Sequence, residues 1–464
     1  MCGIAGFNWR DEQLAIRMTD ALRHRGPDDE GIYADEDVSL GHRRLSILDL
    51  SKLGHQPMDY AHSGRRVVIT YNGEIYNFRE IRQQLEQKGY TFRSSTDTEI
   101  IPAAYLEWGA GCVEKFNGMW AFALYDSSNK QLLLSRDRFG EKPLYYYLQN
   151  GKLVFASEIK AILEHPVQRR CNSDAVSEYL YKGRASHKHD TFFQGIKMLP
   201  PAHNAVLDLR SGSLSLTKYY TPQFGSRRVS RDEFLNVMKK SVARRLVSDV
   251  PVSVSLSSGV DSSSIAALMS EFTDIPVKAF TTATGLSVGD ETGLIRKLLK
   301  QYPNYILEGT SLSEASFCAN YRHIIYHMDE PFARQSSYVR WEIANLTRLH
   351  GLKVLLNGEG ADEILGGYVP FAPHYLLNLA RNFNMIRFVR EVLFTLTHPE
   401  RKRIFDAFHN ATMAPWRNNK YMDAALNRQR KFGIRLSPAI DRNYGSVDLK
   451  EYLYALVSES SLPR

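Results

Sequence analysis

A cysteine stands second in the chain, and this position gives it chemistry that an internal cysteine lacks. Removal of Met1 would leave Cys2 with a free α-amine, whose reference pKa of about 8 keeps a useful fraction neutral near neutral pH. One residue would then carry a thiol nucleophile and a general base, as an amino-terminal threonine does. Any chain can have cysteine second by chance, so the meaning of Cys2 depends on its context.

Short motifs rich in glycine and charge follow Cys2. Glycines beside Cys2 let backbone approach a terminal amine closely, and the loop 24–28 (His-Arg-Gly-Pro-Asp) adds rigidity and charge. Further on stand Arg43-Arg44-Leu45-Ser46, Tyr71-Asn72-Gly73-Glu74-Ile75-Tyr76-Asn77 and Ser95-Thr96-Asp97. Each has an ordinary interpretation as well. Asn72-Gly73 is a common hairpin turn, Arg44 could be a surface residue, and Asp97 could belong to a turn. Their occurrence together and in order favours a catalytic site.

A small-residue loop follows an apolar run in the second half of the chain. Val252–Leu256 leads into Ser257-Ser258-Gly259-Val260-Asp261-Ser262-Ser263 and then into helical sequence. Such a loop presents backbone N–H groups and a helix amino terminus to phosphate. It is not a Walker A motif, because no Gly-Lys-Ser/Thr follows. A serine-rich N-cap of a buried helix would explain the same residues equally well.

The periodicity of apolar residues changes near residue 230. Before it, short alternating strands are separated by turns and a few helices, a pattern that predicts a layered sandwich. The strands are expected at Ser39–Leu48, Arg66–Tyr71, Phe122–Asp126, Gln131–Ser135 and Leu153–Ser157, and the helices at Gln13–Leu22, Phe78–Lys88 and Thr98–Trp108. After it, a helix at Arg231–Ser248 and strands at Val252–Leu256, Val277–Thr282 and Lys353–Leu356 predict a parallel α/β sheet. We expect domains at 1–210 and 230–464, joined by a linker at 211–229.

Composition excludes several classes of protein. Hydrophobic residues make up 43% and charged residues 24% of the chain, as in a soluble globular protein. No apolar run reaches the roughly 18 residues of a membrane span. No signal-peptide pattern opens the chain, so we expect a cytoplasmic protein. The formal net charge of +8 comes from scattered residues without a nucleic-acid-binding motif, so no nucleic-acid partner is expected.

From Cys2 to Lys160 the ordered motifs resemble the glutaminase domain of class II, amino-terminal-nucleophile amidotransferases. The resemblance implies a four-layer αββα sandwich of the Ntn-hydrolase type, in which Cys2 attacks glutamine. By resemblance, the Asn72 amide and the Gly73 N–H form the oxyanion hole. Arg44 then grips the glutamine α-carboxylate, and Asp97 and Glu74 face its α-ammonium.

The later motifs are similar to those of the asparagine synthetase family, whose synthetase domain is a PP-loop ATP pyrophosphatase. Asn357-Gly358-Glu359-Gly360-Ala361-Asp362-Glu363 is its second signature. The resemblance implies ATP and Mg²⁺ as cofactors, with Glu359 supporting formation of an acyl-adenylate. It assigns Asp261 and Asp362 to Mg²⁺. The ATP-binding residues that it implies are Leu256, Ser257, Gly259, Asp261, Ser262, Ser263, Thr282, Asn357 and Gly358.

The implied reaction is an ATP-dependent ligation in two stages. Aspartate would be activated as an acyl-adenylate, and ammonia from glutamine would displace AMP through a shielded tunnel. Another carboxylate, such as a sugar uronate or a natural-product precursor, stays open as acceptor. A glutaminase-only or degenerate subunit stays open too, because Leu449–Arg464 looks like an internal segment of longer members. A second polypeptide could then supply the missing segment, and family members are often homodimers.

Overall fold

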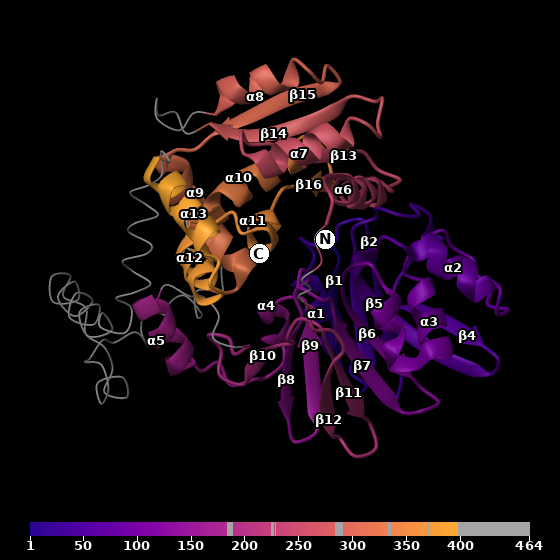
Figure 1. Ribbon diagram of the computed structural model, residues 1–464. Coiled ribbons are helices and arrows are strands. Elements are labelled where there is room, and N and C mark those ends of the chain that lie inside the picture. The colour runs from indigo at the N-terminus through magenta and orange to yellow at the C-terminus, as the bar shows by residue number, and fades with distance from the viewer. Residues whose placement is uncertain are drawn as a thin grey trace. The chain divides into compact units, whose positions relative to one another are not determined.

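The computed structural model describes residues 1–182, 189–223, 227, 229–283, 291–332, 336–369 and 371–397 (Figure 1). Contacts divide the chain into two compact units. One joins Met1–Ser255 to Ala266–Leu356, and the other joins Leu256–Ile265 to the residues from Asn357 onward. Among the described helices, none is long and apolar enough to cross a membrane. The expected segment Leu449–Arg464 lies outside the described residues.

Two six-stranded antiparallel sheets occupy the amino-terminal part of the first unit. The first has the order β10-β8-β9-β1-β3-β2, with strands β1 Gly3–Phe7, β2 Asp29–Ala34, β3 Ser39–Arg44, β8 Tyr145–Gln149, β9 Lys152–Ala156 and β10 Ile196–Met198. The second has the order β12-β11-β7-β6-β5-β4, with strands β4 Met58–His62, β5 Arg65–Ile75, β6 Gly118–Asp126, β7 Gln131–Arg136, β11 His203–Asp208 and β12 Leu214–Lys218.

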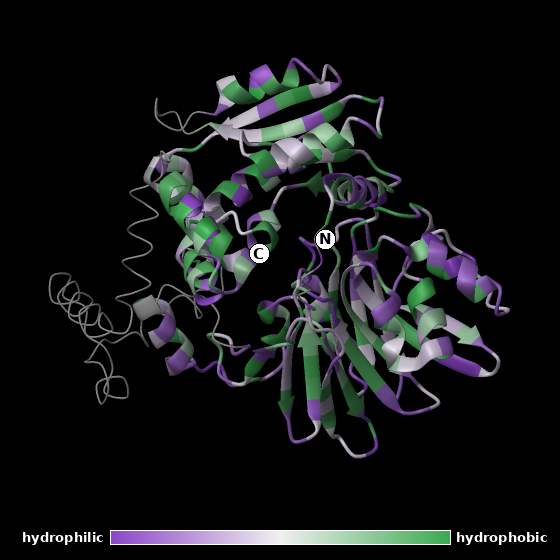
Figure 2. Cartoon of the chain, in the orientation of Figure 1, coloured by the Kyte–Doolittle hydropathy of each residue, from purple (hydrophilic) through white to green (hydrophobic). Residues whose placement is uncertain are grey.

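The alternation of side chains along these strands builds three apolar layers. In β5, Val68 points into the layer between the sheets, whereas Val67 and Ile69 point into an outer layer. Figure 2 shows apolar residues concentrated along the strands. Helices cover the outer faces: α2 Phe78–Glu86 and α3 Ile100–Trp108 on the second sheet, and α1 Glu12–Asp20 and α4 Ile159–Ile162 on the first. The predicted four-layer αββα sandwich is therefore confirmed. The remaining local helices are η1 Lys52–Gly54, η2 Gly109–Lys115 and α5 Ser173–Lys182.

Two strands differ from their predicted bounds next to the candidate site. The expected strand Ser39–Leu48 ends at Arg44, because the chain then turns so that loop carbonyls can accept hydrogen bonds from the Arg44 guanidinium. The expected strand Arg66–Tyr71 continues to Ile75. Its residues Asn72 and Gly73 pair with Ala121 and Trp120 of β6, so the Asn-Gly pair lies inside a strand and forms no hairpin turn.

A four-stranded parallel sheet of order β15-β14-β13-β16 completes the first unit, as the sequence predicted. Its strands are β13 Val252–Ser255, β14 Val277–Ala283, β15 Tyr305–Ser311 and β16 Val354–Leu356, of which β15 was not anticipated. Its helices are α6 Arg231–Arg245, α8 Thr292–Leu299, α9 Glu314–Met328 and α10 Ser336–Leu349. Helix α7 Val260–Met269 runs through both units, and the second also contains α11 Ala361–Leu365, α12 Phe371–Arg381 and α13 Met385–Thr397.

Candidate active site

Cys2 immediately precedes β1, beside the end of β3. Strands β1 and β3 pair Gly3 with Arg43, so the residues that follow β3 lie beside the Cys2 thiol. The Leu45 N–H donates to Cys2 Sγ at 3.3 Å. Burial raises the pKa of the Cys2 thiol, and the nearby terminal amine opposes that rise. The thiol is therefore held in a protonated form that needs a base before it can attack.

The backbone around Cys2 is fixed from two sides. Arg25 Nε donates to the Cys2 carbonyl at 2.9 Å, and the Ile4 N–H donates to Ser157 Oγ at 3.0 Å. The terminal amine of Met1 is buried, which lowers its pKa from 8.0 to about 5. An amine at this place is therefore neutral at neutral pH.

Asn72 faces the sheet that carries Cys2. Thr70, two residues earlier in β5, lies on the same face and donates to the Gly41 carbonyl of β3 at 3.0 Å. The Asn72 side chain is buried, and its Nδ2 has no hydrogen-bond partner among the residues that the structure describes. A buried amide donor without a partner is rare, because leaving it unsatisfied costs free energy. The Asn72 amide is therefore available to donate to an acceptor that is not part of the protein.

The Gly73 N–H points toward the open edge of β5. Strand β4 pairs with β5 only as far as Ile69, and beyond it the Tyr71 N–H donates to Gln56 Oε1 at 2.7 Å. The Ile75 N–H donates to Asp97 Oδ2 at 2.7 Å. Because N–H groups of alternate strand residues point the same way, that of Gly73 lies between these two. A Cβ at position 73 would stand 2.3 Å from the Met119 carbonyl oxygen, so close packing against β6 requires glycine there.

Buried Asp97 and half-buried Glu74 form an acidic pair. Asp97 Oδ2 also accepts a hydrogen bond from Tyr71 Oη at 2.8 Å. Burial raises the pKa of both carboxyls, and the charge of Asp97 raises that of Glu74 further. Two carboxylates that repel each other in a buried place are stabilised by a cation between them. The pair is suited to an ammonium group.

Arg44 lies against the loop that follows β3. Its Nη1 donates to the Ser51 carbonyl at 2.9 Å, and its Nη2 donates to the carbonyls of Leu48, at 3.3 Å, and Asp49. These three bonds use three of the five guanidinium hydrogens. Arg44 therefore shapes the loop. Its predicted grip on a substrate carboxylate stays a prediction.

Lys142 is a buried cation that the sequence did not single out. Its Nζ lies 3.2 Å from Met1 Sδ, and burial lowers its pKa while the charge of Glu74 opposes that shift. Lysine is rarely buried in proteins, and no local sequence pattern predicts which lysine is buried. Tyr71 and Gln56 were missed for a similar reason, because their contacts join segments that are distant in sequence.

The serine loop and the Asn357 segment meet inside the second unit. Ser262 Oγ accepts the Ser257 N–H at 3.0 Å, and Ser263 Oγ donates to the Ser257 carbonyl at 3.3 Å, so the loop folds back on the start of α7. A Cβ on Gly358 would lie 2.8 Å from the Ser262 nitrogen and 3.0 Å from Asp261 Cβ. The two predicted motifs are therefore packed against each other through a glycine.

Ser258, Glu359 and Asp362 lie in or beside these two motifs. Ser258 does not have a positive φ, so a serine at this position does not strain the backbone. The Glu359 N–H donates to Asn357 Oδ1 at 3.2 Å. The side chain of Asp362 lies against Gly367. Among the residues that the structure describes, no group of three or more His, Cys, Asp or Glu side chains could hold a metal ion.

Leu256 and Thr282 stand at strand ends of the parallel sheet. The register aligns Val254 of β13 with Ala279 of β14 and Leu356 of β16, so the three strands end at one edge. Strands β14 and β16 flank β13 on opposite sides, which makes this edge a topological switch point. Open α/β sheets bind their ligands at such an edge. Leu256 and Gly259 continue from β13, and Asn357 continues from β16.

Known proteins match both parts of the chain. The model of a glutamine amidotransferase domain matches residues 1–220, and that of asparagine synthase matches residues 233–456. A putative glutamine-hydrolysing asparagine synthetase 2 of Methanocaldococcus jannaschii is 33% identical over 84% of this chain and 80% of its own length. Asparagine synthetase 3 of Bacillus subtilis is 32% identical over 79% of this chain, which spans 63% of that relative. The amidase chry2 of Gibberella zeae is 30% identical over 80% of this chain and 60% of its own length.

Two matched domains with a buried cysteine site and a serine-loop edge define a glutamine amidotransferase joined to an ATP-dependent synthetase domain. The chain belongs to the family of glutamine-hydrolysing asparagine synthetases, a family of ATP-dependent ligases. A solved glutamine PRPP amidotransferase from B. subtilis, complexed with ADP and GMP, covers 67% of this chain and 81% of its own, at 15% identity and a TM-score of 0.37.

Proposed function

We propose that this chain is a cytoplasmic, glutamine-dependent asparagine synthetase. Cys2 releases ammonia from glutamine within residues 1–210, and residues 230–464 activate aspartate with ATP as an acyl-adenylate that ammonia converts to asparagine. The observation that carries the proposal is the unpartnered Nδ2 of buried Asn72, on the face of β5 directed at the sheet of Cys2. It is the donor that hydrolysis of an amide by Cys2 requires.

The attack on glutamine begins with transfer of the thiol proton. After removal of Met1 the α-amine belongs to Cys2. Burial lowers the pKa of the amine of Met1 to about 5, and a similarly buried amine on Cys2 would be neutral and able to accept the proton. The carbonyl oxygen of the substrate then gains negative charge, which the Asn72 amide and the Gly73 N–H stabilise. Each such donor contributes about 3–4 kcal/mol to the transition state. Ammonia leaves, and water hydrolyses the γ-glutamyl thioester.

Recognition of glutamine requires both of its charged ends to be paired. The raised pKa values of Glu74 and Asp97 support their role as partners of the α-ammonium, because a cation there relieves their repulsion. Arg44 keeps donor capacity beyond its loop bonds and would take the α-carboxylate. The fixed loop around Arg44 would limit its motion, so that little entropy is lost on binding.

The nucleotide would bind at the serine loop and the Asn357 segment. The backbone N–H groups of Gly259 and its neighbours would face the pyrophosphate, together with Ser257, Ser262 and Ser263. Leu256, Thr282, Asn357 and Gly358 would flank AMP, and Glu359 would support formation of the adenylate. The carboxylates of Asp261 and Asp362 fit a Mg²⁺ ion that is also bound by phosphates, and that ion would offset phosphate charge. A homodimer and a second polypeptide partner remain predictions.

Another carboxylate is the second candidate acceptor. One relative whose name does not mention asparagine, the amidase chry2, matches 80% of this chain at 30% identity, similar to the identity of the asparagine synthetases. Under this alternative the glutaminase half and the ATP site keep their roles, and only the acceptor differs. The third candidate function is that of a glutaminase-only subunit, which forms no pyrophosphate.

The test measures pyrophosphate, AMP and glutamate from the purified full chain. Mg·ATP and glutamine are supplied with aspartate, with glutamate, with a uronate or with no carboxylate. Aspartate-dependent pyrophosphate, together with asparagine, is the expected result. If pyrophosphate forms only with another carboxylate, that carboxylate is the acceptor in place of aspartate. Hydrolysis of glutamine without pyrophosphate under every condition would contradict the synthetase function of this chain.

A further inference from the structure

Glu158 links Arg25, which holds the Cys2 backbone, to a set of buried charges. Arg25, which donates to the Cys2 carbonyl, also donates from Nη1 to Glu158 Oε1 at 2.7 Å. The two side chains are only 8% and 7% exposed. His24 Nε2 lies 2.9 Å from the other Glu158 oxygen. Arg25 Nη2 is buried and has no partner among the described residues, so the bonds to Glu158 and to the Cys2 carbonyl orient the guanidinium.

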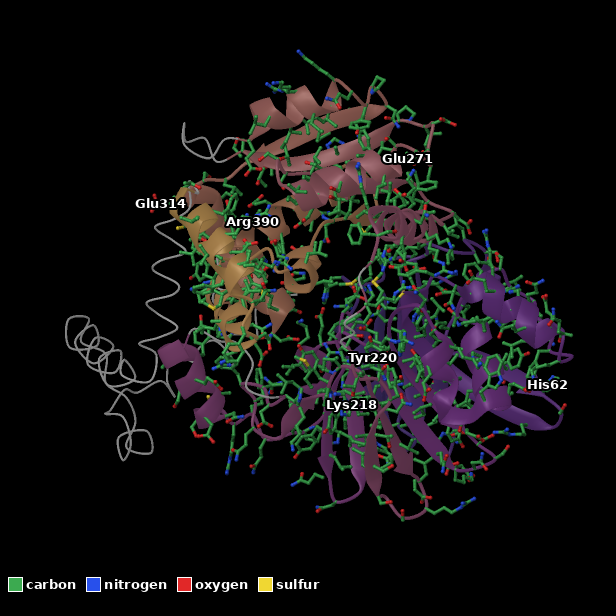
Figure 3. All side chains as sticks on the ribbon, in the orientation of Figure 1. His62, Lys218, Tyr220, Glu271, Glu314 and Arg390 are labelled. Atoms are coloured by element: carbon green, nitrogen blue, oxygen red, sulfur yellow. The ribbon has the colours of Figure 1, made fainter. Side chains whose placement is uncertain are left out.

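Lys160 extends these charges to the end of α9. Its Nζ pairs with Glu158 and, at 2.9 Å, with Asp329 Oδ1, and it also lies 4.9 Å from the centre of the Tyr326 ring. Helix α9 begins at exposed Glu314 (Figure 3) and is capped by Asp329 in a left-handed conformation with φ of 61°. Asp329 Oδ2 accepts the Ile159 N–H at 2.6 Å. All of these residues belong to the first compact unit.

The arrangement fixes positions more tightly than a surface ion pair would. Buried charges are costly unless they are paired in one good geometry, so each member of the chain restrains the next. None of Glu158, Lys160 and Asp329 contacts the thiol. Asp329 lies within the residues matched by the asparagine synthase model, whereas Glu158 lies within the amidotransferase match. The chain of contacts therefore joins the backbone of the nucleophile to the other matched domain.

We propose that Glu158, Lys160 and Asp329 are positioning residues for Cys2, so that the reactivity of its thiol depends on the end of α9. The inference rests on the proposed role of Cys2 as nucleophile. Loss of the Lys160–Asp329 pair would release Glu158 and Arg25, and the Cys2 carbonyl would no longer be held in one place. Small displacements of a reacting group slow a reaction much more than they weaken substrate binding, provided the substrate is held elsewhere.

The experiment compares Lys160→Met, Asp329→Asn and Lys160→Arg with the unaltered full chain. Asparagine keeps an acceptor for the Ile159 N–H, but it removes the charge and replaces the oxygen that accepts from Lys160 with an NH₂ group. Arginine keeps the charge of Lys160. The matched control is Arg244→Gln, because Arg244 also pairs across the two matched domains, with Glu80 at 2.7 Å, but contacts neither Arg25 nor Glu158 in the part of the chain that the structure describes. Glutamine hydrolysis gives kcat and KM, and mass spectrometry of the N-terminal peptide follows Cys2 alkylation by iodoacetamide.

Lys160→Met and Asp329→Asn should each lower kcat and the rate of Cys2 alkylation about tenfold while KM changes less than about twofold. Lys160→Arg should recover most of the rate, and Arg244→Gln should match the unaltered chain. Circular dichroism checks that each variant is folded, and Lys160→Met decides alone if Asp329→Asn does not fold. A folded variant with unchanged kcat and alkylation would overturn the proposal, as would an equal loss in Arg244→Gln. If the unaltered chain does not hydrolyse glutamine, the proposed function fails, and the alkylation rates still test the positioning.

Discussion

At the scale of single residues, the site is defined by groups that the fold leaves unsatisfied. Within the part of the chain that the structure describes, the buried Nδ2 of Asn72 has no partner, and the charges of half-buried Glu74 and buried Asp97 oppose each other. A folded chain normally avoids both situations, because each costs free energy that a bound ligand can return. The substrate amide and its ammonium group would supply the missing partners. Stability and catalysis should therefore respond differently to substitutions here.

Asn72→Ala separates the two responses. The amide nitrogen has no partner to lose, so the free energy of unfolding should change by no more than about 1 kcal/mol. The kcat for glutamine hydrolysis should fall about 100- to 1,000-fold, the usual cost of removing one oxyanion donor. Urea unfolding and steady-state kinetics on the same preparation check both. A large loss of stability with only a small loss of kcat would assign Asn72 a structural role.

At the scale of elements, β3 and β5 hold the two sides of the site at a fixed separation. They belong to opposite sheets, and two hydrogen bonds tie them together beneath the site. Thr70 Oγ1 donates to the Gly41 carbonyl, and His42 Nε2–H donates to the Tyr71 carbonyl at 3.0 Å. His42 is fully buried, and burial lowers its pKa from 6.5 to about 3. The hydrogen bonding between β3 and β5 therefore includes an imidazole, that of His42, which must stay neutral.

His42 makes the free energy of unfolding depend on pH, with a loss of stability in acid. The unfolded chain binds a proton at His42 more strongly than the folded one. The contribution of His42 to stability is therefore complete above pH 6.5 and is lost as pH falls toward 3. By pH 5 the loss is about 2 kcal/mol. His42→Gln can retain the donor and cannot titrate, so it should lose less stability between pH 7.5 and pH 5 in urea unfolding. Equal losses in the two proteins would show that His42 can be protonated without unfolding the chain.

Buried Glu330 gives a second pH dependence, of the opposite sign. Its Oε1 accepts the Phe192 N–H at 2.8 Å, and burial raises its pKa from 4.5 to about 7. The folded chain binds this proton more strongly, so the contribution is complete below pH 4.5 and is lost as pH rises through 7. Glu330→Gln should therefore be more stable than the unaltered chain at pH 8, by about 1–3 kcal/mol, and should lose that advantage near pH 5. A variant that is less stable at pH 8 would show that the carboxylate is needed in its charged form.

At the scale of the whole molecule, the chain joins two chemistries that can be separated. The amidotransferase match and the asparagine synthase match divide the sequence, and the chain spans 80% of the M. jannaschii relative and 63% of the B. subtilis relative. Ammonia is the only species that the proposed halves exchange. Supplying it from solution should therefore replace the first half.

Cys2→Ala tests this separation. Glutamine-dependent synthesis should fall at least about 1,000-fold, because no thioester can form. The rate with ammonium chloride in place of glutamine should stay within about twofold of that of the unaltered chain. Formation of pyrophosphate and the amide product is followed with each nitrogen source. Glutamine-dependent activity that persists in Cys2→Ala would show that another residue attacks the substrate.

The sequence predicted the parts of the fold and site that are local, and it missed those that depend on distant contacts. Alternating strands and the Asn357 segment were predictable, because a few neighbouring residues determine each. The position of Asn72-Gly73 inside β5 was not, since pairing with β6 decides between strand and turn. Buried Lys142 was missed as well, because residues far away in the sequence surround it. The roles of the site residues toward substrates remain predictions.

The most direct test of the account is the detection of a γ-glutamyl group on Cys2. The full chain is mixed with glutamine, quenched in acid within one turnover and digested, and the N-terminal peptide is analysed by mass spectrometry. The account predicts a peptide that begins at Cys2 and carries one γ-glutamyl thioester, which accumulates before glutamate appears and is absent in Cys2→Ala. Release of glutamate with an unmodified Cys2, or with the adduct on Cys112, Cys171 or Cys318, would contradict it.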